Sequence, residues 1–485
     1  SDGILWSSAS VQPWAECRDA TKEGPVCHQR DLFYGPIMQP RGASEACIHA
    51  NVYAPLKRTR LLPVLVYVHG GGFDFGSGDP DAHGPQHLVK EDVVVITFNY
   101  RIGVFGFLSL NSSFIPGNAG LRDIVTLLRW VRRNAESFGG DPDNVTLAGQ
   151  SAGAAAAHLL SLSKVVQGLF KRVILMSGTA SRSFFTTSPV FAQSMSDMFL
   201  GYLNINATDP EEVHRQLVAL PVQRLMEAHN HIQDVTGLLV FTPVVESEHP
   251  GVERIVDADP EILQAEGRGK HIPLIIGFTN AECETFRPRF EEIDITKRII
   301  ATSVLIAPLG AIYTTLPEKL PDKIKAIQEE YFNETLSLER FLKLCSDSYF
   351  IYPALKLAET RAANGGAPVF LYRFAYNADY SVYKEALKLE YCGAGHSEDL
   401  TFVFRANHEL GNKSLSAADL AMTKKMTTYV TNFMRHSKPM KSNYWPPVKK
   451  DKLLYNNIIN YEEADPTRNY RRMIKFFDTI YGSAS

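Results

Sequence analysis

The chain has 485 residues, of which 45% are hydrophobic, and a formal net charge of −3 from 50 basic and 53 acidic residues. A chain of this kind can bury a large core, and we expect a single domain over residues 1–485. The near balance of intermixed basic and acidic residues argues against a nucleic-acid partner. No run of about eighteen apolar residues occurs, so we expect neither a transmembrane helix nor a membrane partner.

Apolar runs alternate with helical patterns along the chain. Strands are predicted at Pro63–Val68, Val93–Tyr100, Val145–Ala148, Val173–Met176, Leu274–Ile276 and Val369–Tyr376. Helices are predicted at Leu121–Glu136, Ala152–Leu162 and Ala417–Met434. This alternation predicts an α/β fold with a mainly parallel central sheet and helices on both faces. Between Ser188 and Lys270 the pattern is polar and helical, which predicts a helical insertion over the active edge of the sheet.

The motif Gly149-Gln150-Ser151-Ala152-Gly153 follows a predicted strand and opens a predicted helix. This is the context of a nucleophile elbow, a tight turn that strains a serine and requires small neighbours. The helix N-terminus adds partial positive charge where an oxyanion forms. The alternative is a chance Gly-x-Ser-x-Gly in an ordinary turn, against which the strand–helix context argues.

A second motif, His69-Gly70-Gly71-Gly72, ends the strand Pro63–Val68. Consecutive glycines let the backbone approach a ligand closely and direct its N–H groups. In hydrolases with a nucleophile elbow, such a loop supplies oxyanion donors together with the N–H that follows the nucleophile. A flexible glycine turn is the alternative interpretation.

A serine hydroxyl needs a general base to act as a nucleophile at neutral pH. Among 14 histidines, His396 is the best candidate, since it lies in a glycine-containing loop that begins at Gly393. A structural histidine is the alternative. The acid that orients the base is expected between serine and histidine, on a loop after a strand. Glu282 and Glu284 both satisfy this condition. Either could equally be a solvated surface carboxylate, and the residues alone do not choose between them.

The cysteines and sequons bear on metal binding and localisation. The six cysteines are Cys17, Cys27, Cys47, Cys283, Cys345 and Cys392. None has the spacing of a zinc site, and no metal or other cofactor is expected. Five N-x-S/T sequons begin at Asn111, Asn144, Asn206, Asn333 and Asn412. They favour a secreted, extracellular glycoprotein, whose signal peptide would already have been removed.

Together these motifs resemble the type-B carboxylesterase and cholinesterase family. The matching segments are Ser44–Cys47, Asn51–Tyr53, His69–Phe73, Asn99–Gly103, Gly117–Leu121, Phe138–Pro142, Gly149–Gly153, Met176–Gly178 and Trp445–Pro447. They extend over nearly all of the chain. The resemblance implies the α/β-hydrolase fold and hydrolysis of carboxylic esters by a serine nucleophile.

The resemblance also implies residue roles. Ser151 matches the nucleophile, and the patterns Gly-x-x-x-x-Glu and Gly-x-x-His identify Glu282, rather than Glu284, as the acid and His396 as the base. The implied oxyanion donors are the N–H groups of Gly71, Gly72 and Ala152. Ser177 matches a buried serine that supports the acid. Cys27 and Cys47 match the first disulfide of the family, with Cys17 as a rival partner.

The sequence departs from the family pattern at three positions, and it is also expected to begin late. Gln150 stands where many relatives have Glu, and Ile124 follows Asp123 where the family usually has Gln. Cys283 follows the acid where Gly is usual, so the course of the loop after Glu282 is open. The segment Gln12–Trp14 resembles one that follows a longer N-terminus, so the family's N-terminal segment is expected to be missing.

The elbow with Gln150 and the pattern from Gly393 to Asp399 resemble family members that hydrolyse the methyl ester of an apolar sesquiterpenoid. The resemblance implies this small ester as substrate, and a broader carboxylesterase for xenobiotic or odorant esters is the alternative. Choline esters are disfavoured. A quaternary ammonium requires an aromatic face, best Trp, and the segment between Cys27 and Cys47, where the choline-binding Trp of the family would lie, contains no Trp. Relatives that act only in adhesion would be expected to lack the nucleophile. This chain keeps the serine, the acid, the histidine and the glycine loop together, which argues against a purely adhesive role.

Overall fold

A central sheet organises the computed structural model, which describes Trp6 and residues 19–33, 42–236, 240–333, 335–407, 413–440, 444–450, 452–460 and 470–482. Within these residues the sheet has eight strands in the order β1-β3-β2-β4-β5-β6-β7-β8. All neighbouring strands are parallel except β1 and β3. The strands are β1 (Ala50–Tyr53), β2 (Leu62–Val68), β3 (Val94–Phe98), β4 (Gly140–Gln150), β5 (Arg172–Met176), β6 (Leu274–Thr279), β7 (Val369–Phe374) and β8 (Asn456–Ile458).

Helices surround this sheet and fill the long connections between strands. Up to β6 they are α1 (Pro80–His83), α2 (Gln86–Val89), α3 (Gly103–Phe107), α4 (Ala119–Asn134), α5 (Ala152–Leu162), α6 (Pro189–Tyr202), α7 (Pro210–Ala219), α8 (Val222–Thr236) and α9 (Pro260–Ala265). Those that follow are α10 (Arg287–Glu292), α11 (Ile295–Ala301), α12 (Leu309–Thr314), α13 (Leu320–Tyr331), α14 (Leu338–Cys345), α15 (Tyr352–Ala363), α16 (Val382–Leu387), α17 (Ala417–His436) and α18 (Tyr470–Tyr481). A π-helical segment, Ser346–Ile351, joins α14 to α15.

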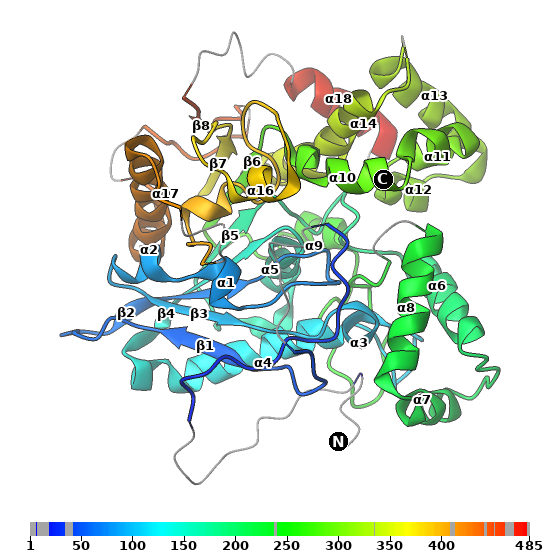
Figure 1. Cartoon of the computed structure of the whole chain (residues 1–485), viewed down its shortest axis with the longest axis horizontal. Coiled ribbons are helices and arrows are strands. Elements are labelled where there is room, and N and C mark those ends of the chain that lie inside the picture. The colour runs from blue at the N-terminus through cyan, green and yellow to red at the C-terminus, as the bar shows by residue number, and fades with distance from the viewer. Residues whose placement is uncertain are drawn as a thin grey trace.

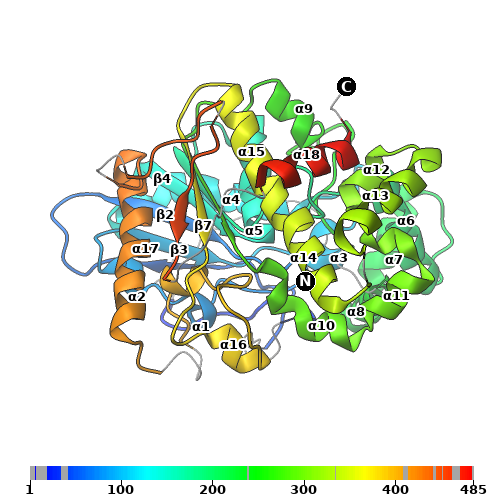
Figure 2. The ribbon, with the colours of Figure 1, turned by 90° about the horizontal axis from the view of Figure 1, so that it is seen from above.

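Alternate residues of the buried strands face two different hydrophobic cores. In β2, Val64 and Val66 pack in the core that includes residues of α4, α5 and α15, whereas Leu65 and Tyr67 pack in the core that includes residues of α17. Figure 2 shows α17 and α2 on one side of the sheet and α4, α5 and α15 on the other. Side chains of a strand point alternately to its two faces, which explains the continuous apolar runs of strands covered on both sides.

The structure confirms the α/β-hydrolase fold class and the predicted elements, with ends shifted by a few residues. The predictions omitted β1 and β8, which are edge strands of only four and three residues and are mostly only half-buried. The segment from Ser188 to Lys270 is helical as predicted and contains α6 to α9. A second group of helices, α10 to α14, follows β6 and was not anticipated; Figure 1 shows it apart from α6, α7 and α8. Over the described residues, no helix combines the length and apolarity required to cross a membrane.

A disulfide joins Cys27 to Cys47, and a second one joins Cys283 to Cys345. Cys17, the rival partner, lies outside the described residues, as do Asn412 and the segment Gln12–Trp14. Cys392 is an exposed free cysteine.

Replacing both Cys27 and Cys47 by alanine should lower the free energy of unfolding by roughly 3 kcal/mol, because the bond restricts the unfolded chain. Urea unfolding of the double variant and the unsubstituted protein measures the difference. Thiol counting on unreduced protein is the control, and two free thiols at these positions would contradict the prediction.

Candidate active site

Ser151 lies in a strained turn between β4 and α5. Its backbone angles are φ 57° and ψ −125°, in a region that residues other than glycine rarely adopt. The turn is crowded on both sides: a Cβ on Gly149 would lie 2.2 Å from the carbonyl oxygen of Gly153, and a Cβ on Gly153 would lie 2.1 Å from that of Val68. Ala152 begins α5, so its N–H has no partner within the helix. The turn therefore presents a serine hydroxyl and a backbone donor at the carboxyl end of the sheet.

The glycine loop after β2 folds into a tight turn beside Ser151. The carbonyl oxygen of Gly71 accepts hydrogen bonds from the N–H groups of Asp74 at 2.9 Å and Phe75 at 3.1 Å. Gly71 has φ 109°, and a Cβ there would lie 2.1 Å from the carbonyl oxygen of Phe75, so only glycine fits. Gly71 and Gly72 line the same pocket as Ser151.

His396 and Glu282 form a buried pair. His396 Nδ1 lies 2.6 Å from Glu282 Oε2, and neither residue is exposed. The other carboxylate oxygen of Glu282 accepts a hydrogen bond from the N–H of Thr279 at 2.7 Å. The N–H of His396 donates to the carbonyl oxygen of Glu282 at 3.1 Å. Both the side chain and the backbone thus hold the imidazole against the carboxylate.

Glu284 has a different environment from Glu282. It is partly exposed and pairs with Arg287, whose Nε lies 2.9 Å from its carboxylate. Two residues apart on a short 3₁₀ helix, the two glutamates point to different partners. The geometry favours Glu282 as the acid, in agreement with the pattern of the family.

The second ring nitrogen of His396 has an unexpected partner. A base for Ser151 needs this nitrogen, Nε2, as its proton acceptor, but Nε2 lies 3.0 Å from the side-chain nitrogen of Gln150. The same amide nitrogen donates to Ser397 Oγ at 2.8 Å. Since Glu282 accepts the proton on Nδ1, Nε2 is left as an acceptor, which an amide N–H can satisfy and a carboxylate cannot. The role of Gln150 could not be found from its position next to the serine alone.

Ser177 is fully buried, but its hydroxyl makes no hydrogen bond to Glu282 or to any other described residue. Its N–H donates to the carbonyl oxygen of Gly277 at 2.8 Å, across the parallel strands β5 and β6. In this structure the hydrogen bond to the second carboxylate oxygen of Glu282 comes from the Thr279 N–H and not from the Ser177 hydroxyl.

Asp399 is a buried carboxyl group close to the His396 loop. Burial raises its pKa from 3.8 to about 7, although a hydrogen bond from Tyr372 opposes the shift and the charge of Glu282 adds to it. Tyr372 donates that hydrogen bond at 2.7 Å. A neutral Asp399 is therefore favoured in acidic solution, where it adds no second negative charge near Glu282.

The pocket above Ser151 is mainly aromatic. Its lining residues are Phe33, Gly71, Gly72, Phe75, Ser151, Phe184, Phe185, Phe286, Arg289, Phe290, Leu309, Cys345, Tyr349 and Phe350. None of them comes from the insertion between Ser188 and Lys270, which we expected to cover this edge; half of them follow β6 instead. The lining has one charged residue, Arg289, which pairs with Glu292 at 2.8 Å. Over the residues that the structure describes, no cluster of His, Cys, Asp and Glu could hold a metal ion.

The second disulfide connects the acid to the wall of this pocket. Cys283 directly follows Glu282, and Cys345 lines the pocket at the end of α14. The N–H of Cys283 also donates to Ser346 Oγ at 2.9 Å, at the start of the π-helical segment. Phe350 on that segment lies 4.6 Å from His396 between ring centroids. The cysteine that departs from the family pattern therefore joins the acid loop to the aromatic wall.

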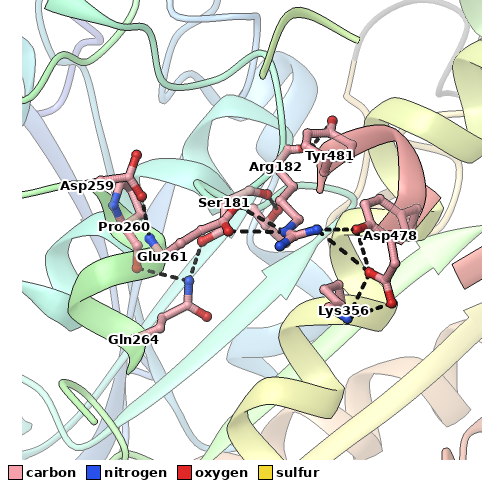
Figure 3. Close-up of polar contacts among 11 residues, drawn as sticks. Ser181, Arg182, Asp259, Pro260, Glu261, Gln264, Lys356, Asp478 and Tyr481 are labelled. Atoms are coloured by element: carbon pink, nitrogen blue, oxygen red, sulfur yellow. Dashed lines mark hydrogen bonds and ion pairs between the residues drawn. The ribbon is translucent and has the colours of Figure 1, made fainter. Parts of the chain in front are cut away.

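The loop after β5, which carries Phe184 and Phe185, is anchored on its other side by Arg182. Figure 3 shows the guanidinium between α9 and the C-terminal helix. Its Nε lies 3.1 Å from Glu261, and another of its nitrogens lies 3.7 Å from Asp478. These buried or half-buried pairs hold that aromatic wall against α9 and α18.

Comparisons with known proteins agree with this geometry. Residues 6–475 match the carboxylesterase family. The chain is 50% identical to a juvenile hormone esterase of Heliothis virescens, over 97% of this chain and 86% of that protein. It is 33% identical to a para-nitrobenzyl esterase of Bacillus subtilis, over 82% and 76% of the two chains. Among solved structures, juvenile hormone esterase from Manduca sexta with OTFP covalently attached matches with a TM-score of 0.95 and 53% identity, covering 99% of this chain and 92% of that one.

We predict that Glu282→Gln lowers turnover of a test ester by ~10³–10⁴, because the amide favours the wrong imidazole tautomer. Glu284→Gln is the matched control and should be much milder, since Glu284 pairs with Arg287 away from the imidazole. Both variants are measured with one ester at one pH after circular dichroism has shown equal folding. If Glu284→Gln lost its turnover while Glu282→Gln kept it, Glu284 would be the acid that orients His396.

Asp399→Asn should change the pH dependence of stability. The folded protein holds the Asp399 proton more tightly than the unfolded chain, so this group's contribution to stability declines as pH rises from about 4 to about 7. Asparagine does not titrate, and the variant should gain in melting temperature relative to the unsubstituted protein as pH increases across this range. Parallel melting curves between pH 5 and pH 8 would contradict the shift.

Proposed function

The chain belongs to the carboxylesterase family and is a carboxylic-ester hydrolase; from this premise we propose that it hydrolyses the methyl ester of juvenile hormone through an acyl-enzyme on Ser151. The single observation that carries the roles is the buried contact of 2.6 Å between His396 and Glu282 beside the strained Ser151 turn. The substrate rests on the esterases named above and on the aromatic pocket.

In the first step, Ser151 Oγ attacks the ester carbonyl carbon and its proton passes to Nε2 of His396. The tetrahedral intermediate carries its negative charge on the former carbonyl oxygen, which the N–H groups of Gly71, Gly72 and Ala152 stabilise. Glu282 keeps the proton on Nδ1 and stabilises the imidazolium that forms. The carbon–oxygen bond to the leaving alcohol then breaks, and His396 returns the proton to that oxygen, releasing methanol.

In the second step, water attacks the acyl group on Ser151 and gives one proton to His396. A second tetrahedral intermediate forms in the same oxyanion site and collapses. Ser151 recovers its proton from His396, and the carboxylic acid is released. Each step returns the imidazole to its starting tautomer.

Gln150 must take part in this sequence, because its amide N–H contacts the nitrogen that accepts the serine proton. Attack requires Nε2 to exchange the Gln150 N–H for the hydroxyl of Ser151. The amide keeps a partner during this exchange, since Ser397 Oγ also accepts from it. A neutral residue at this position also adds no charge beside an apolar substrate.

The pocket supports an apolar ester. Its wall is formed mainly by phenylalanines, which favour an extended hydrocarbon through burial of apolar surface. The lining has no carboxylate that would attract a cation, which argues against choline esters. A broader carboxylesterase for xenobiotic or odorant esters is the second candidate, and the para-nitrobenzyl esterase among the relatives favours it.

We also propose that the protein is secreted. Two disulfides are typical of oxidising compartments. The sequon residues Asn111, Asn206 and Asn333 are exposed and accessible to a glycan.

Ser151→Ala should abolish ester turnover and leave the fold intact, because the turn tolerates the small side chain and loses its nucleophile. A fluorophosphonate probe tests this directly: it should label the unsubstituted enzyme and not the variant. Turnover close to that of the unsubstituted enzyme in the variant would remove Ser151 from the mechanism.

A substrate panel separates the two candidate functions. We expect kcat/KM for juvenile hormone to exceed that for short naphthyl esters, since only the long apolar chain fills the aromatic pocket. The Ser151→Ala variant is the control for non-enzymatic hydrolysis. A preference for naphthyl esters would favour the broader carboxylesterase.

A further inference from the structure

The turn that contains Gly71 and Gly72 also carries a buried carboxylate. Asp74, two residues after Gly72, is 2% exposed, and its Oδ1 lies 2.9 Å from Nε2 of His229. Its other carboxylate oxygen accepts a hydrogen bond from the side-chain amide of Gln233. His229 and Gln233 are equally buried and lie one helical turn apart on α8. We refer to Asp74, His229 and Gln233 as the Asp74 cluster.

The backbone of Asp74 belongs to the turn that presents the oxyanion donors. Its N–H donates to the carbonyl oxygen of Gly71 at 2.9 Å, which closes the turn around Gly72. The side chain of the same residue is bound by α8. A movement of α8 or a loss of its donors is thus transmitted to the peptide units whose N–H groups face the pocket.

A third segment confines the cluster from the side. Gly103 has φ 55°, and its N–H donates to the carbonyl oxygen of Phe73 at 2.6 Å. A Cβ at this position would lie 3.0 Å from Cε1 of His229 and 3.2 Å from Oδ1 of Asp74. There is little free space in which Asp74 could change its rotamer, so the contacts to α8 determine where it lies.

Loss of the contacts between Asp74 and α8 would be strongly destabilising. A buried carboxylate is tolerated only when hydrogen bonds or an opposite charge compensate its desolvation. In the described residues, the hydrogen bond to Asp74 comes from Gln233, and the ring of His229 lies beside the other oxygen; both residues are on α8, more than a hundred residues further along the chain. The insertion does not line the pocket. It nevertheless contacts the oxyanion loop through a buried carboxylate, whose burial depends on the partners that α8 provides.

We propose that the Asp74 cluster holds the N–H groups of Gly71 and Gly72 in the position that the oxyanion requires. Asp74, His229 and Gln233 are positioning residues, because they act through the loop and do not touch the substrate. The inference rests on the proposed oxyanion role of Gly71 and Gly72. It assigns to the helical insertion a part in transition-state stabilisation, in addition to its packing.

A purely structural role makes a different prediction. If the cluster only attaches α8, its loss lowers stability and leaves the rate of the folded enzyme unchanged. If it positions the donors, its loss affects the transition state more than the bound substrate. A reversible analogue of the tetrahedral intermediate distinguishes the two, since its oxyanion uses the same donors.

The test compares Asp74→Ala with Glu246→Ala in the full chain. Glu246 is the matched control: it is a buried carboxylate in the same insertion, and its partners Arg122, Ile255 and Val256 do not line the pocket. For each protein, kcat and KM are measured with 4-nitrophenyl acetate. The inhibition constant of an aliphatic trifluoromethyl ketone, which adds to a serine hydroxyl as a hemiketal, and the melting temperature are measured alongside.

For Asp74→Ala we expect kcat to fall about tenfold, a part of the ~10²–10³ that loss of one whole donor costs, with KM within about twofold. The inhibition constant of the ketone should rise by about the same factor as kcat falls. Glu246→Ala should lower the melting temperature while kcat and the inhibition constant stay within about twofold of the unsubstituted enzyme.

Unchanged kcat and ketone affinity in a folded Asp74→Ala variant would overturn the proposal. If that variant does not fold, Gln233→Leu is used instead, since it removes one donor and leaves the carboxylate paired with His229. A parallel loss in kcat and ketone affinity in this variant supports positioning. Unchanged values reject it. Failure of the proposed function is seen separately, as hydrolysis by the unsubstituted enzyme that Ser151→Ala does not remove.

Discussion

The backbone turn at Ser151 is the constraint on which the arrangement of the site depends. A serine at φ 57° and ψ −125° costs on the order of 1–3 kcal/mol. The turn persists because it joins the buried end of β4, Val145–Gln150, to the fully buried helix α5, and packing on both sides holds it. Gly149, Gly153 and Gly178 leave the space for it; a Cβ on Gly178 would lie 2.1 Å from the carbonyl oxygen of Ser151. The nucleophile, the Ala152 N–H and the neighbouring Gln150 all take their positions from this turn.

The other parts of the site are brought to this turn by the ends of parallel strands. The glycine loop follows β2, the Glu282 loop follows β6, and the His396 loop follows β7. In an open parallel sheet these ends meet at one edge, where ligand sites form. The Thr279 N–H and the Cys283–Cys345 disulfide then fix the acid loop more tightly than strand packing alone. The strand ends therefore position the reacting groups, whereas helical segments outside the sheet provide much of the pocket wall.

The site also limits negative charge around the nucleophile. Gln150 carries no charge, and its amide N–H contacts the imidazole. Burial raises the pKa of Asp399 to about 7, which favours its neutral form in acidic solution. Glu282 is held as the imidazole's partner by a backbone N–H and a ring nitrogen. An arrangement with few charges suits an apolar ester, whose transition state develops its charge at the oxyanion donors.

The sequence by itself determined the fold class, the predicted strands and helices, and the turn at Ser151. These depend on apolar periodicity and on glycines whose lack of a Cβ acts within a few residues. Only the tertiary structure decided the partners of particular side chains. The residues left Glu282 and Glu284 open as the partner of His396, and the family resemblance chose Glu282, which the structure places against the imidazole across 114 residues. The contact of Nε2 with Gln150 and the lack of a hydrogen bond from the Ser177 hydroxyl came from the structure alone. Likewise, Cys283 pairs with a cysteine 62 residues away, and half of the aromatic side chains in the pocket come from the segment after β6. Local sterics are readable from neighbouring residues, whereas a side chain's partner depends on how distant segments pack.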